Sequence, residues 1–335
     1  MKTEDIKILI YTIGFSESIK PKYIETHISW IILLKSFAYK IKKPIKLSFL
    51  DFSSLSKRKY YCLKEIMLNS KMSHGIYKKL VPVKKYHNKL SLGGKGITVD
   101  YAIKMRKLDS EKLMYNLLKK NDVIETQIKK LAKKISNIHV HSKVVKTGFV
   151  LNDKIKQFDE IIIMKDFIPK LLENKYSEII SETIKKVNIF LNINKKLFQE
   201  RIESGFVRDC HGDLHSGNIF LYKDPVIFDC IEFNNIYRKI DILDEISFLC
   251  MDLEFMKKTN LSRKLLYYYF QYAGYSLGPN EKLLHNYYKC YRANIRAKVI
   301  AIQATQSKKG SLTHKNLLKK VEKYLLLMKK YSLKI

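Results

Sequence analysis

The chain has 335 residues, of which 46% are hydrophobic, and its 64 basic side chains against 32 acidic ones give a formal net charge of +32. This apolar content is ample for a buried core in one large domain or two lobes. No uncharged apolar run approaches the length that spans a bilayer, and Glu4 and Asp5 beside the initiator argue against a signal peptide. We therefore expect a cytoplasmic protein without a transmembrane segment.

Lysine far outnumbers arginine and is spread along the whole chain rather than gathered in a tail. This pattern is typical of a solvated lysine-rich surface. Attraction to nucleic acid, anionic lipid or an anionic substrate is the alternative. We favour it less, and for nucleic acid also because its readers more typically use arginine. An odd number of cysteines without a C-x-x-C pair indicates buried thiols rather than a disulfide or zinc framework: Cys62, Cys210, Cys230, Cys250 and Cys290.

The first hundred residues predict a mixed α and β segment. Residues 28–34 and 37–43 are apolar runs separated by Lys35 and Ser36, and they predict two adjacent strands. Residues 6–15 fit either a helix or a first strand, because their periodicity does not decide between the two.

Ser53 and Ser54 are typical capping residues, and the following segment to about Ser73 contains no glycine or proline, which predicts a helix. The G-G-K-G run at residues 93–96 lacks the spacing of a phosphate-binding P-loop. It separates two apolar segments, so we predict a hairpin turn before a strand at residues 97–105.

From residue 109 onward the chain is predicted to be mainly helical, because apolar residues recur between lysine-rich faces. Pro169 stands at a first helical position, where proline is tolerated. Aromatic clusters at residues 267–270 and 287–288 favour core packing over stacking on bases or lining a substrate pocket. The predicted helices cover residues 109–120, 122–140, 169–202, 240–258, 261–276, 281–306 and 312–333.

Residues 208–234, R-D-C-H-G-D-L-H-S-G-N-I-F-L-Y-K-D-P-V-I-F-D-C-I-E-F-N, are the most informative stretch. Asp213 begins an Asp-x-x-x-x-Asn spacing that ends at Asn218. Two short apolar runs flank the turn residues Lys-Asp-Pro and predict a hairpin. That hairpin would bring Asp229, at the exit of its second strand, beside Asn218.

Phosphoryl transfer from a nucleotide uses these groups. An aspartate accepts the proton of the attacking hydroxyl, and a carboxylate and an amide oxygen hold Mg²⁺. The alternative is a polar turn with a structural histidine. We would favour that alternative for an isolated H-G-D triplet, but not for the whole constellation.

The strings at residues 208–215 and 228–234 resemble the aminoglycoside phosphotransferase and choline kinase-like family, whose loop carries H-G-D where protein kinases carry H-R-D. The resemblance extends from about Glu25 into the C-terminal helices. It implies an α+β, two-lobed protein kinase-like fold. We expect a small N-lobe with an antiparallel sheet at residues 1–108 and a larger, mostly helical C-lobe at residues 109–335.

In the C-lobe, the resemblance implies Asp213 as the catalytic base and His211 as the residue that shapes its loop by hydrogen bonding. It also implies Asn218 and Asp229 as magnesium ligands, with Glu232 assisting a second metal ion.

In the N-lobe, Lys40 would hold the α- and β-phosphates of ATP, and Glu65 would orient it. Lys42 is the nearest competitor, since Ala38, Lys40 and Lys42 alternate onto one strand face. Met105 begins the M-R-K-L hinge, whose backbone would bind adenine. Without the resemblance, a lysine in a K-I-K-K run would be interpreted as a solvated strand residue, and Glu65 as an exposed helix residue.

Three departures from the family pattern bear on these expectations. The segment E-T-H-I-S-W at residues 25–30 contains no glycine where a glycine-rich loop would cover the phosphates, so Ser29 or backbone amides would take that place. The P-loop domain often fused to the resembled subgroup does not occur in this sequence. Glu245 stands where the family has aspartate, which puts its bracing contact with the catalytic loop in question.

Acidic residues concentrate just after residue 240, in an otherwise basic chain. One or two would brace the catalytic loop, and others would face a cationic substrate: Asp241, Asp244, Glu245, Asp252 and Glu254. Arg292 and Arg296 lie four residues apart. They would either bind an anionic group or form a structural ion pair with the acidic helix.

We expect an ATP- and Mg²⁺-dependent phosphotransferase that acts on a hydroxyl of a small molecule. The alternative is a catalytically weak or dead kinase-like module that binds a nucleotide, a protein or RNA. A protein kinase is less favoured, because H-G-D replaces H-R-D and no A-P-E-like segment follows Asp229.

Overall fold

The computed structural model describes residues 1–16, 20–47, 50–87, 89–146, 148–166 and 172–335. The chain divides into two units. The sheet unit comprises Met1–Asn116 and Gly217–Tyr237, and the helical unit comprises Leu117–Ser216 and Arg238–Ile335. The sequence predicts a single lobe boundary after residue 108. It does not predict that residues 217–237 belong to the sheet unit.

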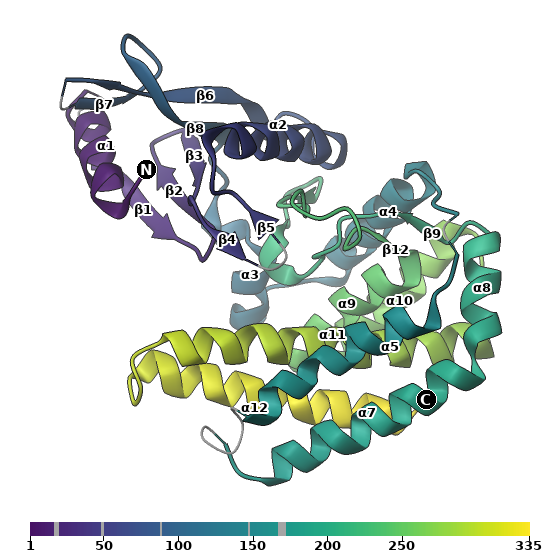
Figure 1. Cartoon of the computed structure of the whole chain (residues 1–335). Helices are drawn as coiled ribbons and strands as arrows, with labels where there is room; N and C mark the ends of the chain where they lie inside the picture. Colours follow the sequence, from purple (N-terminus) through teal and green to yellow (C-terminus); the bar gives the residue numbers. More distant parts are fainter. Residues whose placement is uncertain (17–19, 48–49, 88, 147, 167–171) are drawn as a thin grey trace. The chain divides into compact units, whose positions relative to one another are not determined.

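An antiparallel sheet of six strands forms the sheet unit, in the order β1-β2-β3-β8-β6-β7 (Figure 1). Its strands are β1 (Lys22–Glu25), β2 (Ser29–Leu33), β3 (Phe37–Lys42), β6 (Tyr77–Tyr86), β7 (Lys89–Leu92) and β8 (Ile97–Arg106). A separate small ladder joins β4 (Lys46–Leu47) to β5 (Leu50–Asp51). The predicted strands at residues 28–34 and 37–43 are confirmed as β2 and β3, and Leu34 N donates to Phe37 O across their turn at 2.9 Å.

Opposite faces of this sheet carry two helices, α1 (Thr3–Ser16) and α2 (Leu55–Met72). Tyr39 and Ile41 of β3 share a buried cluster with α1, whereas Ala38 shares one with α2, as expected from side chains that alternate along a strand. Residues 6–15 are helical. Ile6, Leu9 and Ile13 recur every three or four residues and are buried together, while Ile8 is 43% exposed.

The helix predicted after Ser54 is confirmed as α2. Its N-cap is Ser54, whose hydroxyl accepts a hydrogen bond from Lys57 N at 3.2 Å. The buried face of α2 includes Glu65 and Asn69, two polar residues whose partners lie in the candidate active site.

The hairpin predicted around residues 93–96 is wrong. β7 and β8 both pair with β6, through Val83↔Leu92 and Lys84↔Thr98, so the glycine-rich turn crosses β6 instead of joining paired neighbours. Gly96 has a φ of 111°, and a Cβ there would lie 2.3 Å from Lys85 O. Glycine is required at position 96 because the chain crosses directly against the backbone of β6 and leaves no room for a side chain.

A short hairpin of β10 (Ile219–Phe220) and β11 (Val226–Ile227) belongs to the sheet unit. Phe220 and Val226 share a buried cluster with Ala38 and Met105, and Leu221 N donates to Lys112 O at 2.8 Å. The hairpin predicted from residues 219–228 is thus confirmed, and apolar packing on the α2 face of the sheet accounts for its place in this unit.

The helical unit contains most of the predicted helices, with corrected bounds. Residues 169–202 divide at Asn194, Pro169 lies outside the described residues, and no helix had been predicted over α5. The elements around and within this unit are η1 (Ser110–Lys112), α3 (Met114–Lys120), α4 (Glu125–His141), α5 (Leu151–Asp159), η2 (Glu160–Asp166), α7 (Lys175–Ile193), α8 (Lys195–Glu203), β9 (Val207–Asp209), η3 (Ser216–Asn218), β12 (Lys239–Asp241), α9 (Ile242–Phe255), α10 (Thr259–Ala273), α11 (Pro279–Gln306) and α12 (Leu312–Ser332).

Helix α9 is buried on every side except at Glu254. Its buried acidic residues Asp244, Glu245 and Asp252 therefore require partners within the protein. The five cysteines are free and buried, as predicted. In the described part of the chain, none of the helices combines the length and the apolar character that crossing a membrane requires.

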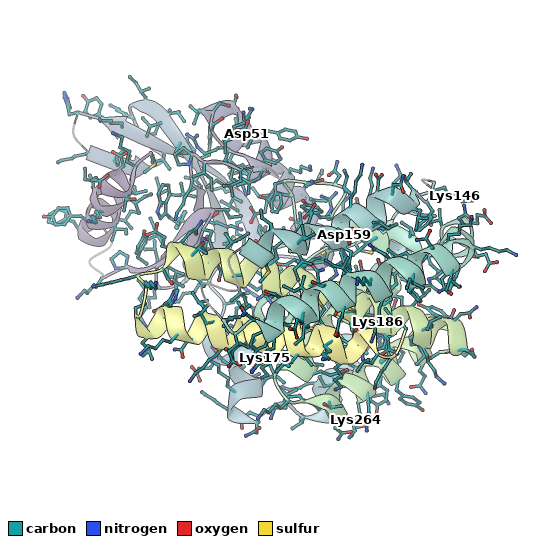
Figure 2. All side chains as sticks on the ribbon, turned by 60° about the horizontal axis from the view of Figure 1, so that its bottom comes forward. Asp51, Lys146, Asp159, Lys175, Lys186 and Lys264 are labelled. Atoms are coloured by element: carbon teal, nitrogen blue, oxygen red, sulfur yellow. The ribbon has the colours of Figure 1, made fainter. Side chains whose placement is uncertain are left out.

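Lysines of the helical unit are distributed over separate elements. Exposed Lys146 lies in the segment after α4, while Lys175 and Lys186 lie on α7; Figure 2 labels all three. This spread fits the interpretation of a solvated lysine-rich surface.

Candidate active site

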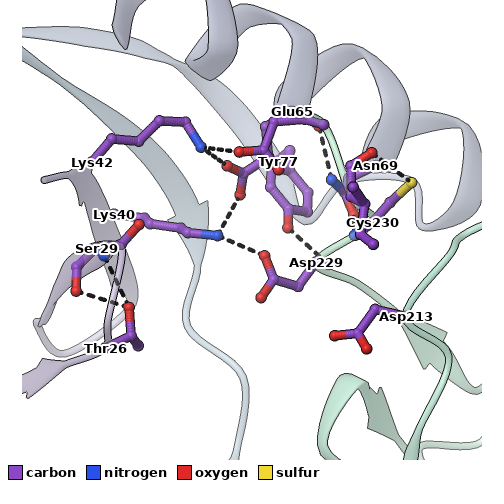
Figure 3. Close-up of polar contacts among 12 residues, drawn as sticks. Thr26, Ser29, Lys40, Lys42, Glu65, Asn69, Tyr77, Asp213, Asp229 and Cys230 are labelled. Carbon is purple, nitrogen blue, oxygen red and sulfur yellow. Dashed lines mark hydrogen bonds and ion pairs between the residues drawn. The ribbon is translucent and has the colours of Figure 1, made fainter. Parts of the chain in front are cut away.

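Two lysines of β3 converge on one carboxylate of α2 (Figure 3). Lys40 Nζ lies 2.8 Å from Glu65 Oε1, and Lys42 Nζ lies 2.6 Å from Glu65 Oε2. Alternation along the strand puts both lysines on the same face, and Glu65 is fully buried between them. The expected Lys40–Glu65 pair therefore exists, with Lys42 as a second partner of the same carboxylate.

Each lysine also binds a carboxylate from the segment after β11. Lys40 Nζ lies 2.5 Å from Asp229 Oδ1, and Lys42 Nζ lies 2.5 Å from Glu232 Oε1. The five side chains form an alternating series, Asp229–Lys40–Glu65–Lys42–Glu232, which we call the ion-pair chain. Only its Asp229 end is substantially exposed, at 42% of the side chain.

Charge within the ion-pair chain is set by burial and by neighbours. Burial disfavours the charged form of each group, but Lys40 and Lys42 lower the pKa of Glu65 to about 2. Burial also opposes the charge of Lys40, yet the carboxylates of Asp229 and Glu65 hold its pKa well above the usual range. At the inner end, burial raises the pKa of Glu232 despite the attraction of Lys42.

The backbone around Asp229 is held in an uncommon conformation. Asp229 has a φ of 64°, in the left-handed region that few residues other than glycine adopt. Its N–H donates to Tyr77 Oη at 3.2 Å, and Cys230 N donates to Asn69 Oδ1 at 2.9 Å. Ser73 Oγ donates to Ile227 O at 2.7 Å. These contacts with Asn69, Ser73 and Tyr77 hold the backbone on both sides of Asp229 in place.

Asn218 lies at the open end of the β10–β11 hairpin, next to the exit toward Asp229. Phe228 N donates to Asn218 O at 3.1 Å, and Ile219 pairs with Ile227. The hairpin thus brings the two predicted magnesium ligands to one end of a short ladder. Their amide and carboxylate oxygens are of the kind that hard cations prefer. Glu232 differs from both, because Lys42 holds its carboxylate and its side chain is only 4% exposed.

Met105 is buried at the end of β8, paired in register with Ala38 of β3 and Tyr77 of β6. The next two backbone N–H groups are taken by the protein: Arg106 N donates to Ile76 O, and Lys107 N donates to Ser36 O.

The glycine-free turn between β1 and β2 is closed by a threonine. Ser29 N donates to Thr26 Oγ1 and Thr26 N donates to Ser29 O, both at 2.9 Å. The Ser29 hydroxyl is buried and makes no hydrogen bond within the described residues. Any contact from this turn to a ligand would therefore not come from the Ser29 hydroxyl but from the backbone or from exposed side chains such as Thr26 and His27.

The H-G-D loop belongs to the helical unit, where Glu245 of α9 fastens it. Glu245 Oε2 accepts from His211 N at 3.1 Å, and Oε1 accepts from Gly212 N at 2.6 Å. Within the loop, Asp213 N donates to His211 Nδ1 at 3.2 Å. The bracing contact that the Asp-to-Glu departure put in question is therefore present.

His139 of α4 completes this arrangement. Its Nε2 lies 2.9 Å from Glu245 Oε2, and its Nδ1 lies 2.7 Å from Tyr269 Oη. Burial alone would raise the pKa of Glu245, but hydrogen bonds from His139 and the loop lower it to about 2.

Asp213 is flanked by cationic or ionisable groups of its own unit. His215 Nε2 lies 3.4 Å from Asp213 Oδ2. Partial burial favours the protonated carboxyl, but His215 and Arg296 lower the pKa of Asp213 below its ordinary range. The side chain is therefore ionised at neutral pH.

Arg292 forms the structural ion pair that was one of its two predicted roles. Its Nε and Nη2 bind Asp244 at 2.7 and 3.0 Å, and its Nη1 donates to Gly212 O at 3.0 Å. Arg292 thus links the acidic helix to the residue before Asp213. Arg296, one turn further along α11, interacts electrostatically with Asp213 and hydrogen-bonds to Tyr324.

All five acidic residues after residue 240 have protein partners. Arg201 binds Asp241, Arg292 binds Asp244, the H-G-D loop and His139 bind Glu245, Ser216 N binds Asp252, and Lys289 and Tyr331 bind Glu254. Every carboxylate of this cluster is therefore bound within the protein. This argues against the expectation that some of them face a cationic substrate.

Among the described residues, one group of three possible metal ligands comes close together: His139, Cys210 and Glu245. Both ring nitrogens of His139 and both oxygens of Glu245 are already in hydrogen bonds. These hydrogen bonds explain why the three residues lie together: they support the H-G-D loop.

Sequence reasoning missed the buried partners of the site. The pairing of Lys42 with Glu65 and Glu232 and the anchors Asn69 and Tyr77 were not predicted. The strand alternation that puts Lys42 on the same face as Lys40 was a signal for the Lys42 pairing. No local sequence pattern marks Asn69 or Tyr77 as anchors.

Solved structures that share this fold include small-molecule kinases. The choline kinase of Cryptosporidium parvum Iowa II aligns at a TM-score of 0.55 and 12% identity, over 98% of this chain and 96% of that one. An ethanolamine kinase of Plasmodium vivax aligns at 0.54 and 13%, over 92% and 82%. The ADP-bound aminoglycoside phosphotransferase APH(2'')-Ib aligns at 0.51 and 14%, over 99% of both chains. The chain therefore has the α+β, protein kinase-like fold of these enzymes.

Uncharacterized proteins of Mycobacterium tuberculosis and Mycobacterium bovis are 28% identical to this chain over 292 residues, or 85% of its length. The chain spans about half of these curated relatives, covering 55% of each. No protein-family model matches the chain.

Proposed function

We propose that this chain is a phosphotransferase that moves the terminal phosphoryl group of ATP to a hydroxyl of a small molecule. The observation that carries the proposal is the ion pair of Lys40 with Glu65, whose ammonium also binds the partly exposed Asp229. In this fold such a lysine binds the phosphates and such an aspartate binds magnesium. The ADP-bound state of one solved neighbour supports nucleotide use.

On the nucleotide side, Lys40 would exchange Asp229 for the α- and β-phosphates while Glu65 keeps its ammonium in place. Met105 would lie beside adenine. Asn218 and Asp229 would hold Mg²⁺, which when bound neutralises negative charge on the phosphates. Their oxygen donors fit this ion, whereas Glu232 is held by Lys42 and we assign it another role below.

On the acceptor side, Asp213 would take the proton of the attacking hydroxyl. The acceptor oxygen forms a bond to the γ-phosphorus, the bond from that phosphorus to the leaving ADP oxygen breaks, and the proton resides on Asp213. The depressed pKa keeps Asp213 ionised before the reaction. His211 and Glu245 would hold the loop in shape.

The charge near Asp213 bears on the choice of acceptor. The neighbouring carboxylates are bound to protein partners, and Arg296 adds a positive charge close to Asp213. Neutral and anionic hydroxyl compounds therefore rank ahead of aminoglycosides, which need an acidic pocket.

The decisive experiment joins a binding assay to a turnover assay. Wild-type protein should show a Mg·ATP-dependent rise in melting temperature, and it should release ADP with at least one member of a panel of hydroxylated metabolites. GTP should be tested in parallel. Asp213→Asn should lose turnover and keep the rise in melting temperature, whereas Lys40→Met should lose both. Full turnover in Asp213→Asn would remove that residue from its proposed role.

A second candidate is a kinase-like module that binds ligands without turnover. The glycine-free β1–β2 turn and the net charge of +32 favour it. Salt-sensitive binding to nucleic acid that does not respond to ATP, with no ADP released, would support this candidate over the enzyme.

A further inference from the structure

Lys42 is more deeply buried than the lysine proposed to bind phosphate. Its side chain is 0% exposed, against 8% for Lys40, and its Nζ also lies 4.8 Å from the centroid of the Phe52 ring. An ammonium in such surroundings is costly unless carboxylates compensate it. Glu65 and Glu232 supply that compensation at 2.6 and 2.5 Å.

The contacts divide the Glu65 carboxylate between two cations. Oε1 is bound to Lys40 and Oε2 to Lys42, so rotation of the carboxylate would break one contact or both. Lys42 therefore fixes the plane in which Glu65 presents its other oxygen to Lys40. Glu65 also keeps a cationic partner when Lys40 turns toward another anion.

The other contact of Lys42 reaches the segment that carries Asp229. Glu232 follows Asp229 by three residues, and its bond to Lys42 adds a side-chain anchor downstream of the backbone anchors at Tyr77 and Asn69. One buried ammonium thus joins the helix that orients Lys40 to the segment of the proposed magnesium ligand.

We infer that Lys42 and Glu232 are positioning residues, which hold Glu65 and Asp229 in the arrangement that Mg·nucleotide binding requires. This inference rests on the proposed function. It assigns Glu232 to the support of the site, in place of direct metal binding. When Lys40 leaves Asp229 for the phosphates, Lys42 keeps Glu65 ionised and oriented.

The test measures the affinity for Mg·ADP by calorimetry and the melting temperature of the protein without nucleotide. Lys42→Met should weaken Mg·ADP binding about tenfold or more, as is usual when a supporting contact behind a metal or phosphate ligand is lost. The matched control is Arg58→Met. Arg58 lies on α2, the helix that carries Glu65, and is 4% exposed. Its Nε binds buried Asp100 at 2.8 Å, outside the ion-pair chain. It should lower the melting temperature and leave the affinity within about twofold.

A double variant, Lys42→Met with Glu232→Gln, separates positioning from stability. Removing both charges avoids an uncompensated buried carboxylate, so the melting temperature should recover relative to Lys42→Met. A positioning role predicts that affinity for Mg·ADP stays low; a purely structural role predicts that affinity recovers with stability. Should Lys42→Met fail to fold, Glu232→Gln, which preserves side-chain shape, provides the same comparison.

The outcomes distinguish this inference from the proposed function. If wild-type protein does not bind Mg·ADP, both are overturned. If wild-type protein binds and Lys42→Met and Glu232→Gln bind equally well, only the positioning role is overturned. Weak binding in Lys42→Met and in the double variant, with normal binding in Arg58→Met, supports it.

Discussion

Replacement of Arg292 by methionine tests how the helical unit holds the H-G-D loop. Arg292 makes two bonds to Asp244, at 2.7 and 3.0 Å, and a third to the carbonyl oxygen of Gly212 at 3.0 Å. Both charged side chains are nearly inaccessible, at 6% and 5% exposure. Methionine keeps most of the volume and removes the charge and all three hydrogen bonds.

The expected loss in the free energy of unfolding is about 4 kcal/mol, because removing one partner of a buried ion pair leaves the other uncompensated. Protonation of Asp244 limits this loss, since burial already raises the pKa of that carboxyl. A loss of this size is a large share of the stability of an ordinary domain. Arg292→Met with Asp244→Leu removes both charges and should recover to within about 1 kcal/mol of wild type.

Urea denaturation of the three proteins measures these changes, and ADP release measures their effect on activity. The double variant should stay impaired in turnover, because the carbonyl of Gly212, adjacent to Asp213, still lacks its donor. A loss below about 1 kcal/mol in Arg292→Met would refute the claim that this buried pair fastens the loop.

Three further predictions concern other elements. Glu245 has its pKa lowered from 4.5 to about 2 on folding, so its stabilisation is complete above pH 4.5 and is lost as the pH falls toward 2, on the order of 3 kcal/mol. Acid denaturation of Glu245→Gln should accordingly show a shallower pH dependence than wild type over that range. Gly96→Ala should cost about 3 kcal/mol in urea denaturation, because its Cβ would meet Lys85 O, while Gly93→Ala, with open space around it, should cost only about 1 kcal/mol. Ser54→Ala should lower stability by about 1 kcal/mol through the lost N-cap, and an unchanged melting temperature would contradict that cap.

Local patterns were enough to predict several elements. The apolar runs of β2 and β3, the serine cap of α2 and the turn of the β10–β11 hairpin each depend on neighbouring residues. The resemblance of two short strings implied the fold, and the solved structures confirm that implication. The named site residues remain predictions, of which Lys40, Glu65 and Asp229 lie within contact of one another.

The sequence predicted wrongly, or left two structures open, where a distant strand or helix decides the outcome. The turn at residues 93–96 has the composition of a hairpin, yet β6 lies between the strands that it joins. Residues 6–15 were ambiguous in the sequence, and the apolar face of the sheet selects the helix because it buries Ile6, Leu9 and Ile13 together.

By itself, the sequence determined which residues alternate onto one strand face, where a helix begins, and that Asn218 and Asp229 lie at the same end of one hairpin. Only the tertiary structure decided that Lys42 shares Glu65 with Lys40. Burial selected these partners, because a charged group taken out of water must find an opposite charge wherever the fold supplies one.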